Sequence, residues 1–475
     1  MTHLPHQHID APIGPVQASS IQSGGRGDHL SEPLCPTAPE NCRCTIRGGC
    51  HEPSDRCRDH HRCSAGRCFR LWLRGIRGRG QARELRGADP HRLADAGRCP
   101  RLLAVGGDRP VRGDLSGGRL DIESEQWNGI QLRLSEALSA LTPPDVVDIG
   151  NTQTSYYAGI GGLLDLAPYR DQLGGADWSS TMNASTLVNG VQYAAPWFAG
   201  LRVVMYNKAL WAKAGLTPPS TQAQWIDDLQ VLRNTPGVSS ALWLPGQDWY
   251  AFDGFLQQAG ASIIVRRDGH WVGNLDSAAG FSAATLFQRL QSFGQAPRNG
   301  DEAHPVQADE FAKGDVASMI AMGYEADTVL QQNPGMAADI GWFPIPGPQS
   351  GVPAKTFLGG SDLAVARNTT NRTLALGFLK LALDDSNESA FAKQSGFLPN
   401  RAGLYSALQG NAYGEAESQA APYAGYTPLV ANWGSVEATP NPITTEFLTP
   451  VLDGEDQVPA ADRADQEISA RLAGD

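Results

Sequence analysis

Residues 189–210 read NGVQYAAPWFAGLRVVMYNKAL, and this stretch decides the fold. Its run RVVMY, which begins at Arg202, is apolar and rich in β-branched residues, and this pattern predicts a short buried strand. The strand leads through Asn207 into a helix that ends before Gly215, because glycine is the usual residue just past a helix C-terminus. The stretch therefore predicts a strand followed directly by a helix, the repeating unit of an α/β protein.

The same pattern extends outward on both sides of this stretch. Towards the N-terminus, residues 145–149 form a short apolar strand after a segment, 130–141, whose apolar residues recur at helical spacing. Towards the C-terminus, a strand is expected at 317–321, and helices are expected at 371–381, 444–452 and 459–472. Helices that alternate with short strands predict an α/β fold with mostly parallel sheets.

The first 120 residues differ in composition from the rest of the chain. They contain 19 Arg against 12 Asp and Glu, a net charge of +7. The chain totals of 38 basic and 50 acidic residues leave 19 and 38 for the remainder, a net charge of −19. All eight Cys and eight of the ten His lie within the first 100 residues. The two parts do not look like the product of one evolved gene.

Residues 1–123 are predicted to be disordered, because so few apolar residues cannot offset the entropy of ordering the chain. We interpret this head as an out-of-frame or wrongly assigned gene start. A zinc or disulfide domain is the alternative, but the head has no C-x-x-C pair of the kind that zinc ribbons use. The head shows no secretory signal, since runs such as Leu102–Val105 are shorter than the apolar core of a signal peptide.

Four stretches, taken in order, carry a resemblance to a known family. They are PDVVDIGNTQ (144–153) with GGLLDL (161–166); NGVQYAAPWFAGLRVVMYNKAL (189–210) with AGLTPPST (214–221); FAKGDVASMIAMGY (311–324); and IGWFPIPGP (340–348) with FLGGSDLAV (357–365) and GFLPNR (396–401). Together they resemble the family 1 extracellular solute-binding proteins, the maltose-binding-protein class, from about Ser124 to the C-terminus. In such a protein an export signal, a first strand and a first helix should precede Ser124, and nothing recognisable stands there.

The resemblance implies a two-lobed α/β fold whose lobes close around a solute at a hinge. It implies an N-lobe built mainly from residues 124–230 with a return segment near 318–362, and a C-lobe built mainly from 231–317 and 363–475. It also implies the substrate-binding component of an ABC importer, which captures a sugar or oligosaccharide and delivers it to separate permease subunits. Such a protein works as a monomer outside the cytoplasm, in the periplasm or as a membrane-anchored lipoprotein, and it needs no cofactor and no metal.

Candidate ligand contacts follow from the chemistry of sugars, which offer C–H faces to aromatic rings and hydroxyl groups to polar side chains. Ligands of open α/β sheets lie beyond the carboxyl ends of strands, which points to Asn151 and Gln153. A loop before a helix adds Trp249 and Tyr250. Positions matched to the family add Trp197, Tyr324, Glu325, Gly360, Ser361, Asp362 and Trp433. Structural roles are the alternatives: a turn for Asn151, core packing for Trp197 and Phe198, and an ion pair for Arg202.

Other functions find less support in the sequence. A glycosidase needs a pair of carboxylates in a cleft, which 38 acidic residues supply by chance, but no G-x-S-x-G, H-E-x-x-H or Walker A motif is present. A nucleic-acid binder is opposed by the net charge of −19 after residue 120. Members of the same superfamily that bind a glycerophosphodiester, a peptide or a metal remain alternatives, although no His, Asp and Glu cluster has metal-ligand spacing.

Overall fold

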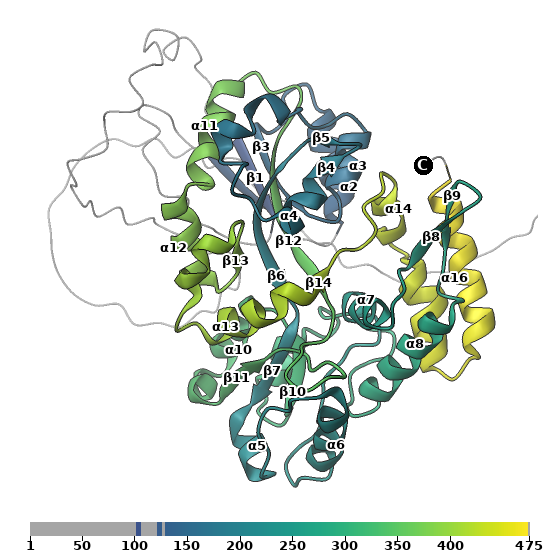
Figure 1. Ribbon diagram of the computed structural model, residues 1–475. Helices are drawn as coiled ribbons and strands as arrows, with labels where there is room; N and C mark the ends of the chain where they lie inside the picture. The colour runs from purple at the N-terminus through teal and green to yellow at the C-terminus, as the bar shows by residue number, and fades with distance from the viewer. Residues whose placement is uncertain (1–100, 106–120, 126–128, 474–475) are drawn as a thin grey trace, which may run out of the picture. The chain divides into compact units, whose positions relative to one another are not determined.

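The computed structural model describes residues 101–105, 121–125 and 129–473, all of which fall in one compact unit (Figure 1). The predicted disorder of residues 1–123 and the zinc alternative therefore concern residues that lie almost wholly outside the described part. Within the described part, no helix is both long enough and apolar enough to cross a membrane.

Two strands precede the position at which the family resemblance begins. Strand β1 (Arg101–Val105) pairs in parallel with β2 (Asp121–Glu125) on one side and with β3 (Val146–Gly150) on the other. The expectation that no recognisable strand precedes Ser124 is therefore wrong at these positions. A five-residue strand carries too little local pattern to be recognised, because its place is set by pairing with a distant partner, here β3.

The larger sheet has seven strands in the described part of the chain, in the order β13-β6-β12-β3-β1-β2, with β14 paired to β12. The further strands are β6 (Ala195–Leu201), β12 (Thr356–Val365), β13 (Leu398–Pro399) and β14 (Ala424–Gly425). β12 lies antiparallel to both β3 and β6, and its pairing with β6 contains a bulge between Ser361 and Asp362.

Helices cover both faces of this sheet (Figure 1). On one face, Val147 and Ala364 pack with Leu134 of α2; on the other, Val146 and Leu363 belong to the core that includes Phe378 of α11. Alternate strand residues thus serve opposite faces, as the pleat of a strand requires. The lobe contains α2 (Ile130–Ser139), α3 (Thr154–Gly159), α4 (Ser180–Asn183), α11 (Arg372–Ala382), α12 (Asp385–Ser395), α13 (Ala412–Ala420) and the hairpin β4 (Leu187–Val188) with β5 (Val191–Gln192). Short 3-10 turns complete it: η1 (Ala167–Tyr169), η2 (Asp171–Leu173), η3 (Ala184–Thr186), η5 (Ala402–Leu408) and η6 (Ala421–Tyr423).

The second lobe is built on a three-stranded antiparallel sheet, β10-β7-β11, of β10 (Ser318–Ala321), β7 (Val203–Asn207) and β11 (Ile340–Phe343). Its helices are α5 (Lys208–Lys213), α6 (Gln222–Arg233), α7 (Trp249–Gln258), α8 (Ala278–Gln291), α9 (Gln307–Phe311), α10 (Gly323–Gln332), α14 (Trp433–Glu437), α15 (Thr449–Leu452) and α16 (Gln457–Arg471). A 3-10 turn η4 (Pro334–Ala338), a π-helical turn η7 (Ile443–Leu448) and the hairpin β8 (Ile264–Arg267) with β9 (His270–Gly273) belong to it too.

The stretch quoted first connects the two lobes. β6 ends at Leu201 in the first sheet and β7 begins at Val203 in the second, so only Arg202 separates them. Leu201 and Val203 are fully buried. The predicted helix after Asn207 is confirmed as α5, and Gly215 follows it with a positive φ of 73°.

The apolar cores place the lobe boundaries at other residues than those expected from the sequence. Two cores join residues between 130 and 203 with residues between 358 and 420, and these form the first lobe. Two others join residues between 204 and 354 with residues between 430 and 472. The expected return segment 318–362 therefore lies mostly in the second lobe, and residues 363–425 lie in the first. The expected boundaries followed sequence order, whereas sheet pairing brings distant segments together.

The expectation of mostly parallel sheets is also wrong. In the described part, β12 is antiparallel to β3 and β6, and all of the pairs in the smaller sheet are antiparallel. The reason is that β6 and β12 pass between the lobes in opposite directions, so the chain returns along the sheet without a βαβ crossover.

Candidate functional site

Polar side chains from the two lobes meet in the loop that follows β3. Thr152 donates from its hydroxyl to Oε2 of Glu437 at 2.8 Å, and Gln153 donates from Nε2 to the same oxygen at 3.5 Å. Oε1 of Gln153 accepts from the hydroxyl of Tyr157 at 2.9 Å. Because Glu437 is the last residue of α14, this loop of the first lobe faces the second lobe.

Asn151 lies in the same loop but is bound to its own lobe. Its backbone N–H donates to the carbonyl of Gly360 at 3.0 Å, and its side-chain Nδ2 donates to the carbonyl of Leu358 at 2.9 Å. The side chain is buried. The structure thus gives Asn151 a role in the turn, which was the alternative interpretation, and its neighbours Thr152 and Gln153 bond to Glu437 of the second lobe.

A buried ionic cluster surrounds Arg202, at the point where β6 passes into β7. Its guanidinium forms ion pairs with Glu302 and, at 3.3 Å, with Oδ1 of Asp248. It also lies over the ring of Tyr250, 4.7 Å from the ring centroid. Asp248 in turn caps α7, because its Oδ1 accepts from the backbone N–H of Ala251 at 3.1 Å.

The charges of this cluster do not balance. Burial raises the pKa of Asp248 to about 7, and the Glu302 carboxylate raises it as well, while Arg202 lowers it. Oδ2 of Asp248 has no hydrogen-bond partner within the described residues. The guanidinium of Arg202 therefore pairs with two carboxyl groups, and Oδ2 of Asp248 is a buried acceptor without a donor among the described residues.

Aromatic rings pack beside this cluster. The ring of Tyr250 lies 4.5 Å from that of Phe357, nearly parallel to it, and 4.0 Å from that of Trp249. Trp249 is 6.2 Å from Trp433, whose ring is fully buried and whose Nε1 donates to Oε1 of Glu437 at 2.8 Å. The structure thus brings Trp249, Tyr250 and Trp433 together, but Trp433 is buried and holds Glu437 through its Nε1.

Tyr324 and Glu325, at the start of α10, have different environments. The side chain of Tyr324 is 57% exposed, whereas that of Glu325 is buried. Desolvation raises the pKa of the Tyr324 hydroxyl, and the carboxylates of Glu325 and Glu302 contribute. Tyr324 is thus an exposed ring whose hydroxyl lies near the carboxylates of Glu325 and Glu302, and its role as a ligand contact stays a prediction.

Glu325 uses both of its carboxylate oxygens within its own lobe. Oε1 accepts from the backbone N–H of Met322 at 2.8 Å, and Oε2 accepts from Nε2 of Gln307 at 2.6 Å. The first of these bonds caps α10. Glu325 therefore supports the helix that presents Tyr324.

Gly360, Ser361 and Asp362 lie on β12 in the first lobe, at and next to its bulge. A Cβ at Gly360 would lie 2.2 Å from the carbonyl oxygen of Phe198, so the neighbouring strand β6 requires glycine at this position. Ser361 and Asp362 are almost completely buried. Asp362 accepts from Thr154 at 2.7 Å and from Ser185 at 3.1 Å, and burial raises its pKa to about 7.

Trp197 occupies the core of the first lobe. Its ring lies 5.5 Å from that of Phe391 and 5.4 Å from that of Phe198, and only 4% of the residue is exposed. The structure thus supports the alternative of core packing, because β6 is buried along its whole length.

Thr152, Glu302 and Glu437 were not predicted from the sequence. Glu302 lies in an irregular segment, where no spacing marks it. Glu437 stands four residues after Trp433, so the two share one face of a helix, and this spacing was a usable signal.

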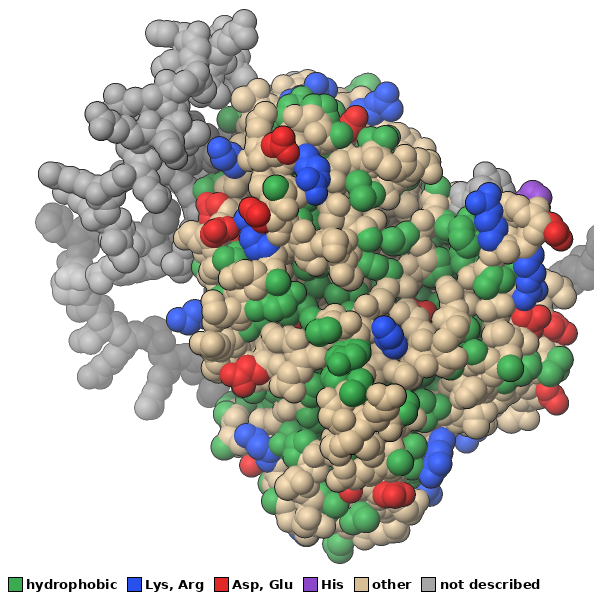
Figure 2. Space-filling view, viewed as in Figure 1, with side chains coloured by type: hydrophobic (Ala, Val, Ile, Leu, Met, Phe, Trp, Pro, Cys, Tyr) green, Lys and Arg blue, Asp and Glu red, His purple; other side chains and the backbone are tan. Residues whose placement is uncertain are grey.

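No group of three or more His, Cys, Asp or Glu side chains that could hold a metal occurs within the described residues. Figure 2 shows that charged side chains are scattered over the face in view and form no basic block on its described part. The candidate site thus combines rings with carboxyl, amide and hydroxyl groups, which can bind a compound rich in hydroxyl groups.

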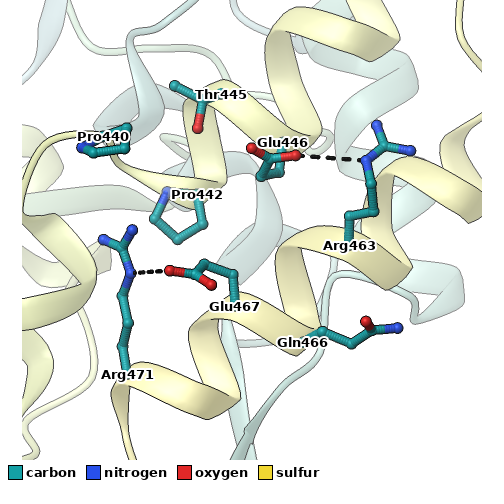
Figure 3. Close-up of a pocket in the computed structure, with 8 residues that line it drawn as sticks. All are labelled: Pro440, Pro442, Thr445, Glu446, Arg463, Gln466, Glu467 and Arg471. Atoms are coloured by element: carbon teal, nitrogen blue, oxygen red, sulfur yellow. Dashed lines mark hydrogen bonds and ion pairs between the residues drawn. The ribbon is translucent and has the colours of Figure 1, made fainter. Parts of the chain in front are cut away.

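A separate surface hollow of about 360 Å³ lies between η7 and α16 (Figure 3). Its charged side chains are paired with one another, Arg463 with Glu446 and Arg471 with Glu467. Arg471 also donates to the carbonyls of Ser435 and Ala438, both at 3.0 Å, and so fixes the end of α14 on α16.

Comparisons with known proteins agree with this architecture. The model of the bacterial extracellular solute-binding protein family matches residues 115–422. The chain is 42% identical over 356 residues to the diacetylchitobiose-binding protein DasA of Streptomyces coelicolor, covering 75% of this chain and 83% of that protein.

Two solved structures show a similar fold. The sugar-binding protein MalE of Xanthomonas citri matches with a TM-score of 0.67 at 22% identity, covering 79% of this chain and 98% of its own. The GacH receptor of Streptomyces glaucescens, known with and without acarbose, matches with a TM-score of 0.68 at 20% identity, covering 79% and 99%. The predicted two-lobed, maltose-binding-like fold is confirmed by these matches.

Proposed function

This chain belongs to the bacterial extracellular solute-binding proteins, and we propose that it captures a sugar or oligosaccharide between its two lobes for an ABC importer. Members of this family bind solutes outside the cytoplasm and work with permease subunits. The observation that supports a carbohydrate is a set of neighbouring ring, hydroxyl and carboxyl groups: Tyr250 interacts with Thr152 and Glu302, and the exposed ring of Tyr324 lies near Glu302. Such a set matches the C–H faces and hydroxyl groups of a sugar.

The charge of the site favours a neutral solute over a phosphate ester. Arg202 is the cation at the centre of the cluster, and it is already paired with Asp248 and Glu302. Glu437 adds a further carboxyl group a short distance away. An anionic solute such as a glycerophosphodiester would meet like charge without an unpaired cation to offset it. That ligand class therefore stays the second candidate.

The finer parts of the proposal follow the family. The protein acts as a monomer, carries out no catalysis and is held at the outer face of the membrane as a lipoprotein or is free in the periplasm. Diacetylchitobiose is the first ligand to test, because the relative that is 42% identical is named for it.

Thermal unfolding of the full chain with a panel of solutes tests the function. A sugar present at about 100 times its Kd should stabilise the protein by about 2.7 kcal/mol, which appears as a higher unfolding midpoint. Diacetylchitobiose, maltose and glycerophosphocholine form the panel, and a nitrophenyl glycoside is assayed for turnover. The absence of a shift with every sugar, or steady hydrolysis of the glycoside, contradicts the proposal.

Tyr324 provides a direct test of the site. Tyr324→Ala should weaken sugar binding roughly tenfold, because an exposed ring that packs on the sugar is lost. The unfolding midpoint should stay unchanged, since the ring is 57% exposed. Leu132→Ala, on the outer face of α2 and 67% exposed, is the matched control and should leave affinity unchanged. Equal affinities for the Tyr324→Ala variant and the parent would remove Tyr324 from the site.

A further inference from the structure

The two lobes are bonded to each other at a place other than the strands that connect them. Glu437, on α14, accepts from Thr152 and Gln153 of the loop after β3. A second bond joins the same elements, because the hydroxyl of Ser155 donates to the carbonyl of Val430 at 2.9 Å. Thr154–Gly159 belongs to the first lobe, and Val430 and Trp433 belong to a core of the second. These bonds therefore cross from lobe to lobe.

α14 lies close to α3 at the same place. A Cβ on Gly434 of α14 would lie 3.1 Å from Cβ of Tyr156 and 2.9 Å from Nε2 of Gln131, the end of a flexible side chain. A larger residue at position 434 would therefore require Gln131 to move and Tyr156 to shift. Figure 1 shows α14 next to α2 and α3. Glycine thus favours the close approach of α14 to α3.

α14 is fixed to the rest of the second lobe. Arg471 binds the carbonyls of Ser435 and Ala438, in the hollow of Figure 3, and Trp433 is fully buried in the second lobe. A carboxylate on such a helix moves with its lobe. Breaking the bond from Glu437 to Thr152 therefore requires that the lobes separate, that the loop after β3 moves, or that one of the two side chains changes its rotamer.

Glu437 is partly buried, between donors from both lobes. Burial raises the pKa of Glu437 to about 7, although Thr152, Trp433 and Gln153 all donate to it and lower the value. The carboxylate in turn raises the pKa of Tyr157 in the first lobe. No cation is among the groups that influence it.

We propose that Glu437, Thr152 and Gln153 form an interlobe latch, which holds the lobes together before a solute enters. The proposal rests on the proposed function only in taking a sugar as the solute that the lobes enclose. The latch positions Gln153, a candidate ligand contact, and it slows both the entry and the escape of the solute.

Hydrogen exchange of the ligand-free full chain tests the latch without any ligand. Glu437→Ala should increase amide exchange in peptides covering residues 151–159, which lie in the other lobe. Thr152→Val should increase exchange in peptides covering 430–438. If either side chain had only a local role, amide exchange in the opposite lobe would stay unchanged, and that result would overturn the proposal. Glu310→Ala, at an exposed pair with Lys313 in the second lobe, is the control.

Binding kinetics test the second consequence. Loss of a hydrogen bond to a charged group should raise the dissociation rate of the sugar about tenfold. The association rate should also rise, because a ligand-free protein without the latch opens more often. Thr152→Val should act in the same direction, and the double variant should add little to Glu437→Ala. An association rate that stays equal or falls contradicts the latch.

The outcomes separate the two proposals. If the Glu437→Ala and Thr152→Val variants change amide exchange in the opposite lobe but no sugar binds, the latch stands and the proposed function fails. If a sugar binds but amide exchange in the opposite lobe is unchanged, the function stands and the latch fails. Glu437→Gln keeps one acceptor oxygen and should therefore show smaller effects than Glu437→Ala in both measurements.

Discussion

Two of the regions that join the lobes differ in character: the crossover around Arg202 and the contact between α3 and α14. At the crossover, the chain passes from β6 to β7, and a buried cation is bound by Asp248 and Glu302. At the α3–α14 contact, which lies next to the segment 427–429 that leads from the first lobe into the second, uncharged donors from one lobe meet Glu437 of the other.

This difference indicates which region is fixed and which can open. Separating a buried ion pair is costly because each charge then loses its partner while it stays in surroundings that solvate it poorly. Separating Glu437 from Thr152 exposes a carboxylate and a hydroxyl to water, which solvates both. The crossover is therefore suited to be the pivot, and the α3–α14 contact is suited to be the edge that separates.

Replacement of Arg202 should have the largest effect on stability. Arg202→Met leaves Asp248 and Glu302 without their cation and should lower the free energy of unfolding by about 3 kcal/mol. Urea unfolding measures this change. Arg298→Met removes an exposed ion pair with Asp453 and, as the control, should change stability by less than about 0.5 kcal/mol. If the two variants lost similar amounts of free energy of unfolding, the Arg202 cluster would contribute no more than an exposed ion pair.

The pH dependence of stability should be the next largest effect. Burial raises the pKa values of Asp248, Asp253, Glu325, Asp362 and Glu437 to about 7 in the folded protein. A carboxyl group with a raised pKa in the folded state stabilises the fold below its unfolded pKa, and this contribution is lost as the pH rises through about 7.

Thermal unfolding at several pH values measures this effect. The midpoint should be about 5 °C lower at pH 8 than at pH 5.5. Glu437→Gln should flatten the dependence only in part, because Asp248 and the other buried carboxyl groups remain. A midpoint that rises between these pH values is incompatible with the raised pKa values.

The smallest expected effect concerns the α3–α14 contact alone. Gly434→Ala adds a Cβ that pushes against Gln131 and Tyr156, and should lower sugar affinity about threefold by holding the lobes slightly apart. The free energy of unfolding should change by less than about 1 kcal/mol, because alanine also favours the helix. Gly403→Ala, where a Cβ meets nothing within 4 Å, is the control. A large loss of stability with unchanged affinity would show that the contact is part of the folded core.

The sequence was sufficient to predict the strands and helices that carry a strong local pattern. The strand around Val204, helix α5 and its terminal Gly215 were all predicted from spacing and residue type. Lobe membership was not, because it depends on which strands pair. β12 pairs with β3 and β6, and this pairing draws the segment after residue 363 back into the first lobe.

The candidate site was predictable in its location more than in its roles. Tyr250 lies beside Arg202 at the crossover, and Tyr324 is exposed at the start of α10, so the role of both as ligand contacts stays a prediction. Trp197 and Asp362 are buried instead, since a position near the end of a strand does not reveal which way a side chain points. Glu302 could not be found, because its importance comes only from Arg202, which is 100 residues away in sequence.

The interleaved composition of the two lobes has a consequence for biosynthesis. The core of the first lobe includes Tyr413 and Ala420, and that of the second includes Ile468 and Leu472. A chain that emerges from its N-terminus therefore exposes the apolar faces of β6 and β7 until the late segments have followed. Neither lobe can complete its core early during synthesis, so the body stays unfolded for most of its emergence. This delay suits a chain that must be threaded through a membrane before it folds on the far side.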